Sequence, residues 1–110
     1  MSGYGRGGPD AQKKAYDMLV QSEAGLIAMT GTPEVPSKTG VAAADIAAGL
    51  YAFSGVLAAL VRRGRTGKGG QVDVSMFDAI VEGMGYPLYT TVDHGGAPPR
   101  SGRGHAAMVP

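Results

Sequence analysis

The longest apolar pattern of the chain lies in its middle, between Lys38 and Arg62. Large apolar side chains recur there at the spacing of one helix face: Ile46, Leu50, Phe53, Leu57 and Leu60. The opposite side carries small residues: Ala47, Ala48, Ala52, Ala58 and Ala59, with Gly49 and Gly55. This pattern predicts a helix from about residue 45 to residue 63 that is buried on both sides. A chain of 110 residues is short for supplying both neighbours, so we expect that part of the packing lies elsewhere.

Weaker patterns flank this helix. Residues 13–27 place apolar side chains on one helix face, and residues 31–40 read as a loop because they contain Pro33 and Pro36. Residues 71–75 alternate between polar and apolar, which predicts a short strand. A second helix should start at Ser75 or the next residue. Its inner side is expected to contain Met76, Phe77, Ile80, Val81 and Met84. Helix, strand and helix in this order predict an α/β fold class.

Composition narrows the function classes. The chain is 44% hydrophobic and 17% charged with a net charge of +1, which gives no electrostatic reason to expect nucleic acid or a membrane as partner. It has no cysteine, which excludes disulfides and thiol catalysis. His94 and His105 lack partners at metal-binding spacing, so no metal site is expected. We expect no apolar run of membrane-spanning length and, without a secretory pattern, a cytoplasmic location.

Asp45 is the one charged residue between Lys38 and Arg62. As a structural residue it would cap the helix by accepting backbone N–H bonds, a role worth about 1 kcal/mol. As a functional residue it would be a carboxylate nucleophile, kept ionised by the positive end of the helix dipole. Spacing alone favours the cap. The two interpretations are compatible, and both stay open at this point.

Two other segments invite a binding hypothesis. The glycine-rich residues 2–8 could cradle a phosphate, but they lack the Gly-Lys-Ser/Thr ending of a P-loop and a preceding strand. The basic residues 62–68 could contact phosphate, but no aromatic residues are interleaved to stack bases. A flexible loop and a solvated helix end are the better interpretations.

Segments spread along the chain resemble the family III CoA-transferases, of the formyl-CoA transferase and carnitine CoA-transferase (CaiB/BaiF) type. They are Ser-Gly-Tyr-Gly at 2–5 with Gly-Pro at 8–9, Lys-Ala-Tyr-Asp at 14–17, Ala-Asp-Ile-Ala-Ala-Gly at 44–49, Leu-Ala-Ala-Leu at 57–60, Arg-Thr-Gly-Lys-Gly at 65–69 and Val-Asp-Val-Ser-Met-Phe-Asp-Ala at 72–79. The resemblance covers essentially the whole chain in the right order. Family members are several times longer, so the resemblance implies an internal fragment.

The resemblance implies a fold and a chemistry. Residues 1–92 would be part of the large, Rossmann-type nucleotide-binding-like domain, mostly helical in this fragment, and residues 93–110 a Gly/Pro/Arg-rich loop or linker. Asp45 would be the nucleophile that carries CoA as an aspartyl thioester between an acyl-CoA and a small carboxylic acid. No cofactor would be bound permanently, because the CoA thioester is the substrate. The parent protein would be an interlocked homodimer.

The resemblance also implies a CoA site at Lys14, Ala15, Tyr16 and Asp17. Lys14 would offer a point charge to a CoA phosphate, and Tyr16 an aromatic wall near the thioester. Without the resemblance, Lys14 would be interpreted as helix surface and Tyr16 as core.

Two alternatives remain beside the transferase. Acyl-CoA racemases or epimerases of the same superfamily carry a histidine where this chain has Tyr16. A tyrosine, with an ordinary pKa near 10, is a poor replacement in a two-base proton exchange. The other alternative is a non-catalytic, truncated chain. Because the flanking regions of the family are absent, we expect the isolated chain to be weakly active or inactive.

Overall fold

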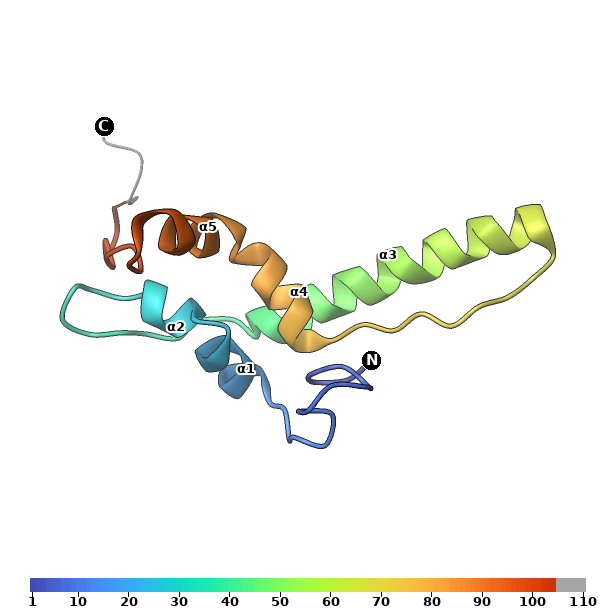
Figure 1. Cartoon of the computed structure of the whole chain (residues 1–110), viewed down its shortest axis with the longest axis horizontal. Helices are drawn as coiled ribbons and strands as arrows, with labels where there is room; N and C mark the ends of the chain where they lie inside the picture. The colour runs from blue at the N-terminus through green and yellow to red at the C-terminus, as the bar shows by residue number, and fades with distance from the viewer. Residues whose placement is uncertain (105–110) are drawn as a thin grey trace.

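The computed structural model describes residues 1–104, and the last part of the predicted linker, residues 105–110 with His105, lies outside them. The helices are α1 (Asp17–Glu23), α2 (Leu26–Met29), α3 (Ala43–Thr66), α4 (Met76–Gly83) and α5 (Gly85–His94). The four shorter helices gather around the start of α3, whose remaining turns extend away from them (Figure 1). The described part of the chain measures 54 × 34 × 28 Å along its principal axes.

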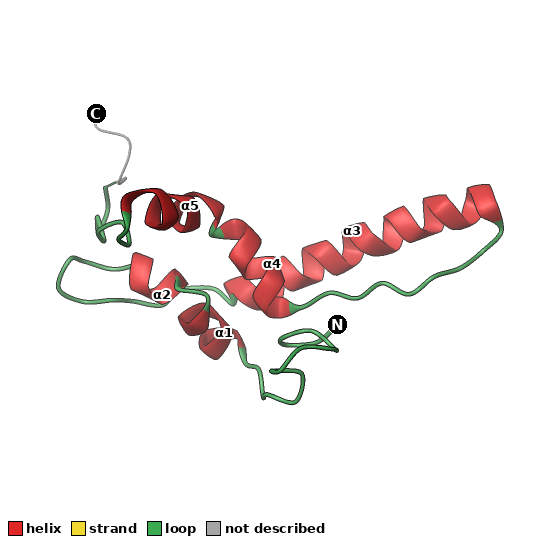
Figure 2. Ribbon diagram, in the orientation of Figure 1, coloured by secondary structure: helices red, strands yellow, loops and turns green. Residues whose placement is uncertain are grey.

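The described residues contain no strand, so the strand predicted at residues 71–75 is wrong (Figure 2). A strand needs a partner along its length, and this segment pairs only through one parallel bridge between Ser2 and Ser75. The chain as described is therefore mostly helical, and the sheet of an α/β fold is not visible in it.

The predicted helix over residues 13–27 is shorter than expected and divided. Gly25 adopts a left-handed conformation with φ of 86°, which ends α1 and begins α2. Glycine reaches this region at little cost because it has no Cβ. Residues 13–16 lie outside the helix and form the extended approach to α1.

Helix α3 begins two residues earlier than expected and ends at Thr66. Its N-cap residue is Ala42, whose methyl side chain cannot accept a hydrogen bond, so the interpretation of Asp45 as the N-cap residue is wrong. Asp45 is the third helical residue and lies in the first turn. The cap comes from another part of the chain, as described below.

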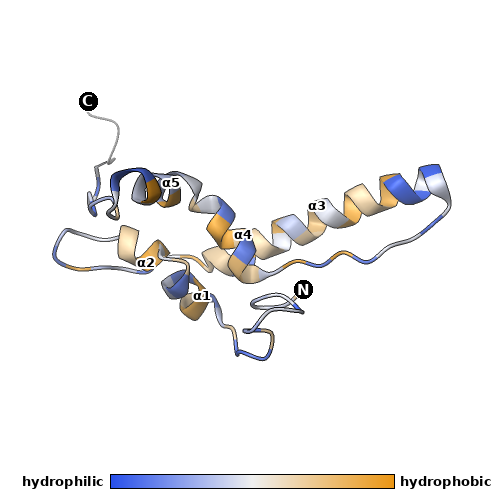
Figure 3. Cartoon of the chain, in the orientation of Figure 1, coloured by the Kyte–Doolittle hydropathy of each residue, from blue (hydrophilic) through white to orange (hydrophobic). Residues whose placement is uncertain are grey.

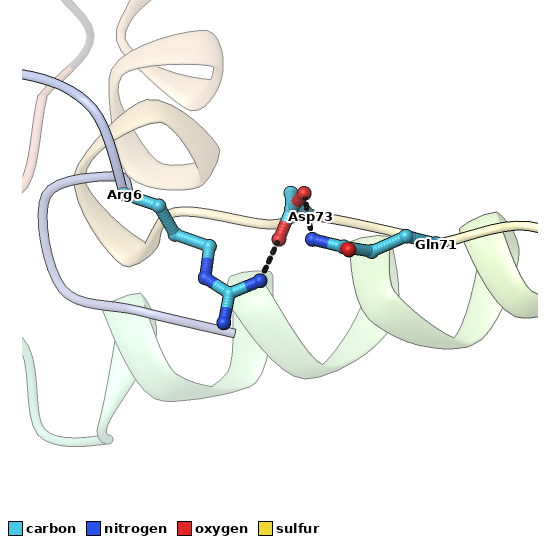
Figure 4. Close-up of polar contacts among 3 residues, drawn as sticks. All are labelled: Arg6, Gln71 and Asp73. Atoms are coloured by element: carbon cyan, nitrogen blue, oxygen red, sulfur yellow. Dashed lines mark hydrogen bonds and ion pairs between the residues drawn. The ribbon is translucent and has the colours of Figure 1, made fainter.

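The segment after α3 runs back along the helix toward its start (Figure 1). Gly55 permits this approach, because a Cβ at that position would lie 2.7 Å from Cγ1 of Val72. The segment is held by the N-terminal loop, where Arg6 forms an ion pair of 3.4 Å with Asp73, and Gln71 also donates to Asp73 (Figure 4). The glycine-rich N-terminal loop is thereby tied to the chain just before α4.

The core is small and lies where α1, α3 and α4 meet. Its central residues are Val20, Ala44 and Ile80. Helix α4 faces this core as predicted: Ala79, Ile80 and the C-cap residue Met84 are buried, and Met76, Phe77 and Val81 are half-buried. Its N-cap is Ser75, whose hydroxyl accepts a 3.2 Å hydrogen bond from the backbone N–H of Asp78.

The large apolar side chains of α3 are exposed, contrary to a helix buried on both sides. Phe53 is 64% exposed, and the rest of its stripe is similar: Ile46, Leu50, Leu57 and Leu60. On the small-residue side, Ala44 and Ala48 are fully buried near the start of the helix. Colouring by hydropathy shows apolar and neutral residues along α3, with hydrophilic residues at its far end (Figure 3).

Helix α3 is also long and apolar enough to cross a membrane by length and composition. The expectation that no segment reaches this length is therefore wrong, because the charged residues of the segment lie near its two ends. Length and composition do not distinguish a membrane span from a core helix of a larger protein.

Candidate functional site

Asp45 lies in the first turn of α3, and its side chain is exposed. Within residues 1–104 no hydrogen bond or ion pair engages its carboxylate, whereas its backbone N–H donates to Asp17. The partial positive charge of a helix N-terminus stabilises a carboxylate at this position by about 0.3–1 kcal/mol. The Asp45 side chain is therefore accessible from outside the described part of the chain.

Asp17, the first residue of α1, caps α3. Its Oδ1 accepts hydrogen bonds from the backbone N–H groups of Ala44, at 2.8 Å, and Asp45, at 3.3 Å. These groups belong to the first turn, where no carbonyl of the helix itself can accept them. The bond therefore joins the start of α1 to the residue that we expect to carry the chemistry.

A buried glutamine holds Asp17 in place. Gln21 is fully buried, and its Nε2 donates to Asp17 Oδ2 at 2.6 Å. Its Oε1 accepts from the backbone N–H of Thr39 at 3.4 Å and lies 3.1 Å from the Thr39 hydroxyl. Gln21 Nε2 also lies 3.4 Å from the carbonyl oxygen of Val41. The loop before α3 is thus fixed to α1 by the same side chain that orients the cap.

The predicted CoA segment, residues 14–17, is the approach to α1. Lys14 is exposed, Tyr16 is 67% exposed and is the N-cap residue of α1, and Ala15 is half-buried against the core. Through the bonds of Asp17, the structure brings this segment to the start of α3 and hence to Asp45. The four side chains of this segment are not equally accessible to a ligand, because Asp17 is half-buried and already accepts hydrogen bonds.

A cluster of charges lies beside this approach. The ammonium of Lys13 forms an ion pair of 2.7 Å with Glu23 and lies 4.8 Å from the centroid of the Tyr4 ring. The hydrogen bond raises the pKa of Lys13 and lowers that of Glu23. Burial raises the pKa of Tyr4. The cluster fastens the N-terminal loop to α1 and is separate from the Asp17 cap.

Cavities open elsewhere on the described surface. One, of about 440 Å³, lies between α3, the segment before α4 and α4 itself, and its polar lining includes Asp73, Asp78 and Glu82. Another, of about 360 Å³, is mostly apolar and lies between α2, α4 and α5. A third, also of about 360 Å³, lies between α3 and α4. None of these three is lined by Asp45 or by residues 14–17. In residues 1–104, therefore, Asp45 lies on an open surface.

The described part of the chain contains no group of side chains that could bind a metal ion. No three His, Asp or Glu side chains among residues 1–104 lie together in a way that could hold an ion. His94 is exposed at the end of α5. The residues gathered near Asp45 are carboxylate, amide and hydroxyl groups that bond one another.

The sequence interpretation missed Gln21 and Thr39. It treated residues 13–27 as a helix with an apolar face and residues 31–40 as a plain loop. The available signal was Gln21, a polar residue four positions after Asp17 and therefore on the same face of the helix. The local sequence gives no signal that Thr39 is the partner of Gln21.

Comparison with known proteins gives one consistent result. The family model described as CoA-transferase family III matches residues 1–110. The chain is 40% identical over 111 residues to an acetyl-CoA:oxalate CoA-transferase of Acetobacter aceti, covering 99% of this chain and 28% of that protein. It is 33% identical over 112 residues to the human succinyl-CoA:glutarate CoA-transferase, covering 100% of this chain and 25% of that protein.

A solved structure agrees with the sequence comparisons. The crystal structure of a CAIB/BAIF family protein from Brucella suis matches with a TM-score of 0.90 at 36% identity, over 99% of this chain and 29% of that one. A protein from Mycobacterium tuberculosis matches with a TM-score of 0.74 at 33% identity, over 83% of this chain and 26% of that one. The chain thus spans between a quarter and a third of the length of these relatives.

Proposed function

The chain belongs to CoA-transferase family III, and we propose that the complete polypeptide containing it moves CoA from an acyl-CoA donor to a carboxylic acid through a covalent intermediate on Asp45. The observation that carries this proposal is the exposed carboxylate in the first turn of α3, in a chain matched to the family from end to end. A carboxylate nucleophile divides one difficult exchange into reversible acyl transfers.

The proposed reaction begins at the thioester carbonyl. A carboxylate oxygen of Asp45 attacks it, the carbon–sulfur bond breaks, and a mixed anhydride and CoA thiolate result. The thiolate then attacks the aspartyl carbonyl of the anhydride and releases the donor acid as its carboxylate. This leaves CoA as a thioester on Asp45. No water is consumed and no redox change occurs in either step.

The second half repeats these steps in reverse with a new acid. The acceptor carboxylate attacks the aspartyl thioester and again gives an anhydride and CoA thiolate. The thiolate attacks the acyl carbonyl of the acceptor, which forms the new acyl-CoA and returns Asp45 to its carboxylate. The dipole of α3 favours the charged form of Asp45 at the start and at the end of this cycle.

Residues 14–17 are proposed to lie along the bound CoA. The exposed ammonium of Lys14 suits a phosphate of CoA, and the exposed ring of Tyr16 suits the wall of a thioester pocket. Tyr16 also argues against the racemase, because a two-base exchange at the α-carbon needs a second base near neutral pH. The transferase is therefore the function that these side chains favour.

The acceptor is proposed to be a small dicarboxylic acid. Relatives carry oxalate, glutarate and mesaconate in their names, with 40%, 33% and 31% identity to this chain. The donor acids in the same names are acetate and succinate. The acids in these names are all small, which supports a small acid as the acceptor.

The remainder of the complete polypeptide is proposed to cover the exposed stripe of α3, to supply the sheet of an α/β nucleotide-binding-like domain and to form an interlocked homodimer. The support is the apolar stripe itself, which within residues 1–104 has no cover. Such a cover would turn the open surface around Asp45 into a cleft. A cytoplasmic location is part of the same proposal.

The test is to trap the intermediate. The complete polypeptide is incubated with succinyl-CoA or acetyl-CoA, treated with hydroxylamine, and measured by intact mass and peptide mapping beside Asp45→Ala. We expect a hydroxamate at Asp45 that is absent from the variant. A hydroxamate at another residue, or equal CoA transfer by Asp45→Ala, would overturn the assignment. The isolated chain, assayed in parallel, is expected to show little or no adduct.

A further inference from the structure

Asp17 belongs to the segment expected to bind CoA, yet its carboxylate already accepts hydrogen bonds from α3 and from Gln21. Both of its oxygens accept hydrogen bonds: Oδ1 from the first turn of α3 and Oδ2 from Gln21. The side chain is half-buried, unlike Lys14 and Tyr16 on either side of it. A carboxylate is also a poor neighbour for the phosphates of CoA, because like charges repel.

We propose that Asp17 is a positioning residue, which sets the first turn of α3 and with it the direction of the Asp45 carboxylate. The inference rests on the proposed role of Asp45 as nucleophile. Helix α3 cannot set this turn alone, because its N-cap residue is an alanine. The N–H of Ala44 and that of Asp45 both end on Asp17 Oδ1, so the backbone of the nucleophile itself is fixed to α1.

The direction of each hydrogen bond in this network is determined. The backbone N–H of Thr39 can only donate, so the atom of Gln21 that faces it must be Oε1, and Nε2 must face Asp17. Both oxygens of residue 17 must therefore accept. An aspartate meets this requirement and an asparagine does not, although the two have nearly the same shape. The requirement makes residue 17 testable without changing its volume.

Asp17→Asn places two donors against each other. If its Oδ1 keeps the N–H groups of α3, its Nδ2 faces the Nε2 of Gln21. The double variant Asp17→Asn/Gln21→Glu restores the donor–acceptor pairs from Thr39 through residues 21 and 17 to α3, because a glutamate accepts from both sides. It gives up the long 3.4 Å bond from residue 21 to the carbonyl oxygen of Val41. It keeps one negative charge and moves it one turn along α1. The double variant thus has the total charge of the wild type and its donor–acceptor order from Thr39 to α3, and differs from the wild type in the position of the charge.

The experiment measures kcat and the KM for acyl-CoA in the complete polypeptide. Asp17→Asn is expected to lower kcat about 10- to 100-fold, with KM changed less than about threefold, because a misdirected nucleophile is bound to its substrate but reacts slowly. The double variant is expected to recover kcat to within about threefold of the wild type. Asp93→Asn, an exposed aspartate on α5, is the matched control and should leave both parameters unchanged.

Amide hydrogen exchange gives a readout that does not depend on activity. Exchange at Ala44 and Asp45 should accelerate at least about tenfold in Asp17→Asn and return to the wild-type rate in the double variant. If Asp17→Asn fails to fold, the double variant decides. A folded double variant that protects these amides but stays as slow as the single variant would overturn the proposal.

Other outcomes separate this inference from the function it rests on. A rise in KM with unchanged kcat in Asp17→Asn would show that Asp17 contacts CoA, and would overturn the positioning role. Unchanged kcat, KM and exchange would overturn it as well. If Asp45→Ala transfers CoA as well as the wild type, the assignment of Asp45 fails instead, and with it the positioning role. Altered exchange at Ala44 and Asp45 would then show a structural cap only.

Discussion

The two ends of α3 differ in how closely the rest of the described chain packs against them. The first turn is capped by Asp17 and packed against α1 and α4, with Ala44 and Ala48 fully buried. The far half projects from the helical cluster, and its apolar side chains are exposed, Val61 at 64%. Both ends belong to one continuous helix of 24 residues. The difference teaches that residues 1–104 supply the packing at the first turns of α3 and leave the far half uncovered.

The largest expected effect is at the exposed apolar stripe of α3 and depends on which protein is measured. Phe53→Ala in the complete polypeptide should lower the free energy of unfolding by about 3–5 kcal/mol if the remainder covers the stripe. In residues 1–110 alone it should change stability by less than about 0.5 kcal/mol, because the ring is exposed there. Denaturant unfolding of both proteins gives the comparison. Equal, small effects in both would show that the stripe has no cover in the complete polypeptide.

Val20→Ala tests the packed end. Val20 is 0% exposed in the core against α3 and α4, so loss of its two methyl groups should cost about 2 kcal/mol. Val61→Ala, in the far half where Val61 is 64% exposed, is the matched substitution and should cost less than about 0.5 kcal/mol in this chain. Urea unfolding midpoints of the two variants measure the difference. A reversed order would contradict the location of the core.

Ser75→Ala removes the N-cap of α4, which packs on the first half of α3. The loss should cost about 1 kcal/mol, because the N–H of Asp78 loses its acceptor and the hydroxyl no longer donates to the carbonyl of Gly3. Ser54→Ala, on the exposed surface of α3, is the control and is expected to be neutral. Thermal unfolding followed by circular dichroism would measure both. A neutral Ser75→Ala would mean that water replaces the cap fully.

The smallest effect concerns pH. The pKa of Glu23 is lowered by Lys13, so its contribution is complete above the ordinary glutamate range near 4.5 and is lost as pH falls through the lowered value. The pKa of Lys13 is raised, so its contribution is complete below about 10.5 and is lost as pH rises through the raised value. Both groups are exposed, and the change in melting temperature should be slight. Glu23→Gln should remove the acid limb of the profile, and an unchanged limb would assign it to other carboxylates.

The sequence predicts the elements whose signals are local. The stripe of α3 and the inner face of α4 follow from helical spacing, and the start of α4 follows from the capping preference of Ser75. The sequence analysis predicts no separate helix at residues 85–94, where α5 lies and where Gly85 and Pro87 occupy the first turn. A proline in the first turn of a helix costs little, since its absent N–H would have no intrahelical partner.

What the sequence does not predict depends on partners far along the chain. The cap of α3 comes from Asp17, 27 residues before Ala44, while the local rule selects Asp45. The predicted strand fails for the same reason, because alternation describes one strand and says nothing about its neighbour. At the candidate site, the pattern shows only that Asp45 is a lone charge in an apolar segment, and the roles proposed for Asp45 and for residues 14–17 come from the resemblance. The difference between Asp17 and its neighbours Lys14 and Tyr16 follows only from the hydrogen bonds in the structure.

The attachment of the N-terminal loop has a consequence for the order of folding. Gly3 accepts from the hydroxyl of Ser75, a bond that spans 72 residues, and Ser2 bonds with Val74 and Met76. During synthesis at about 5–20 residues per second, the loop waits roughly 4–14 s before its partners exist. The turns of α1 and α3 are local and form in microseconds. We therefore expect the loop of residues 2–5 to dock only after the chain has passed the start of α4, later than the local turns of α1 and α3.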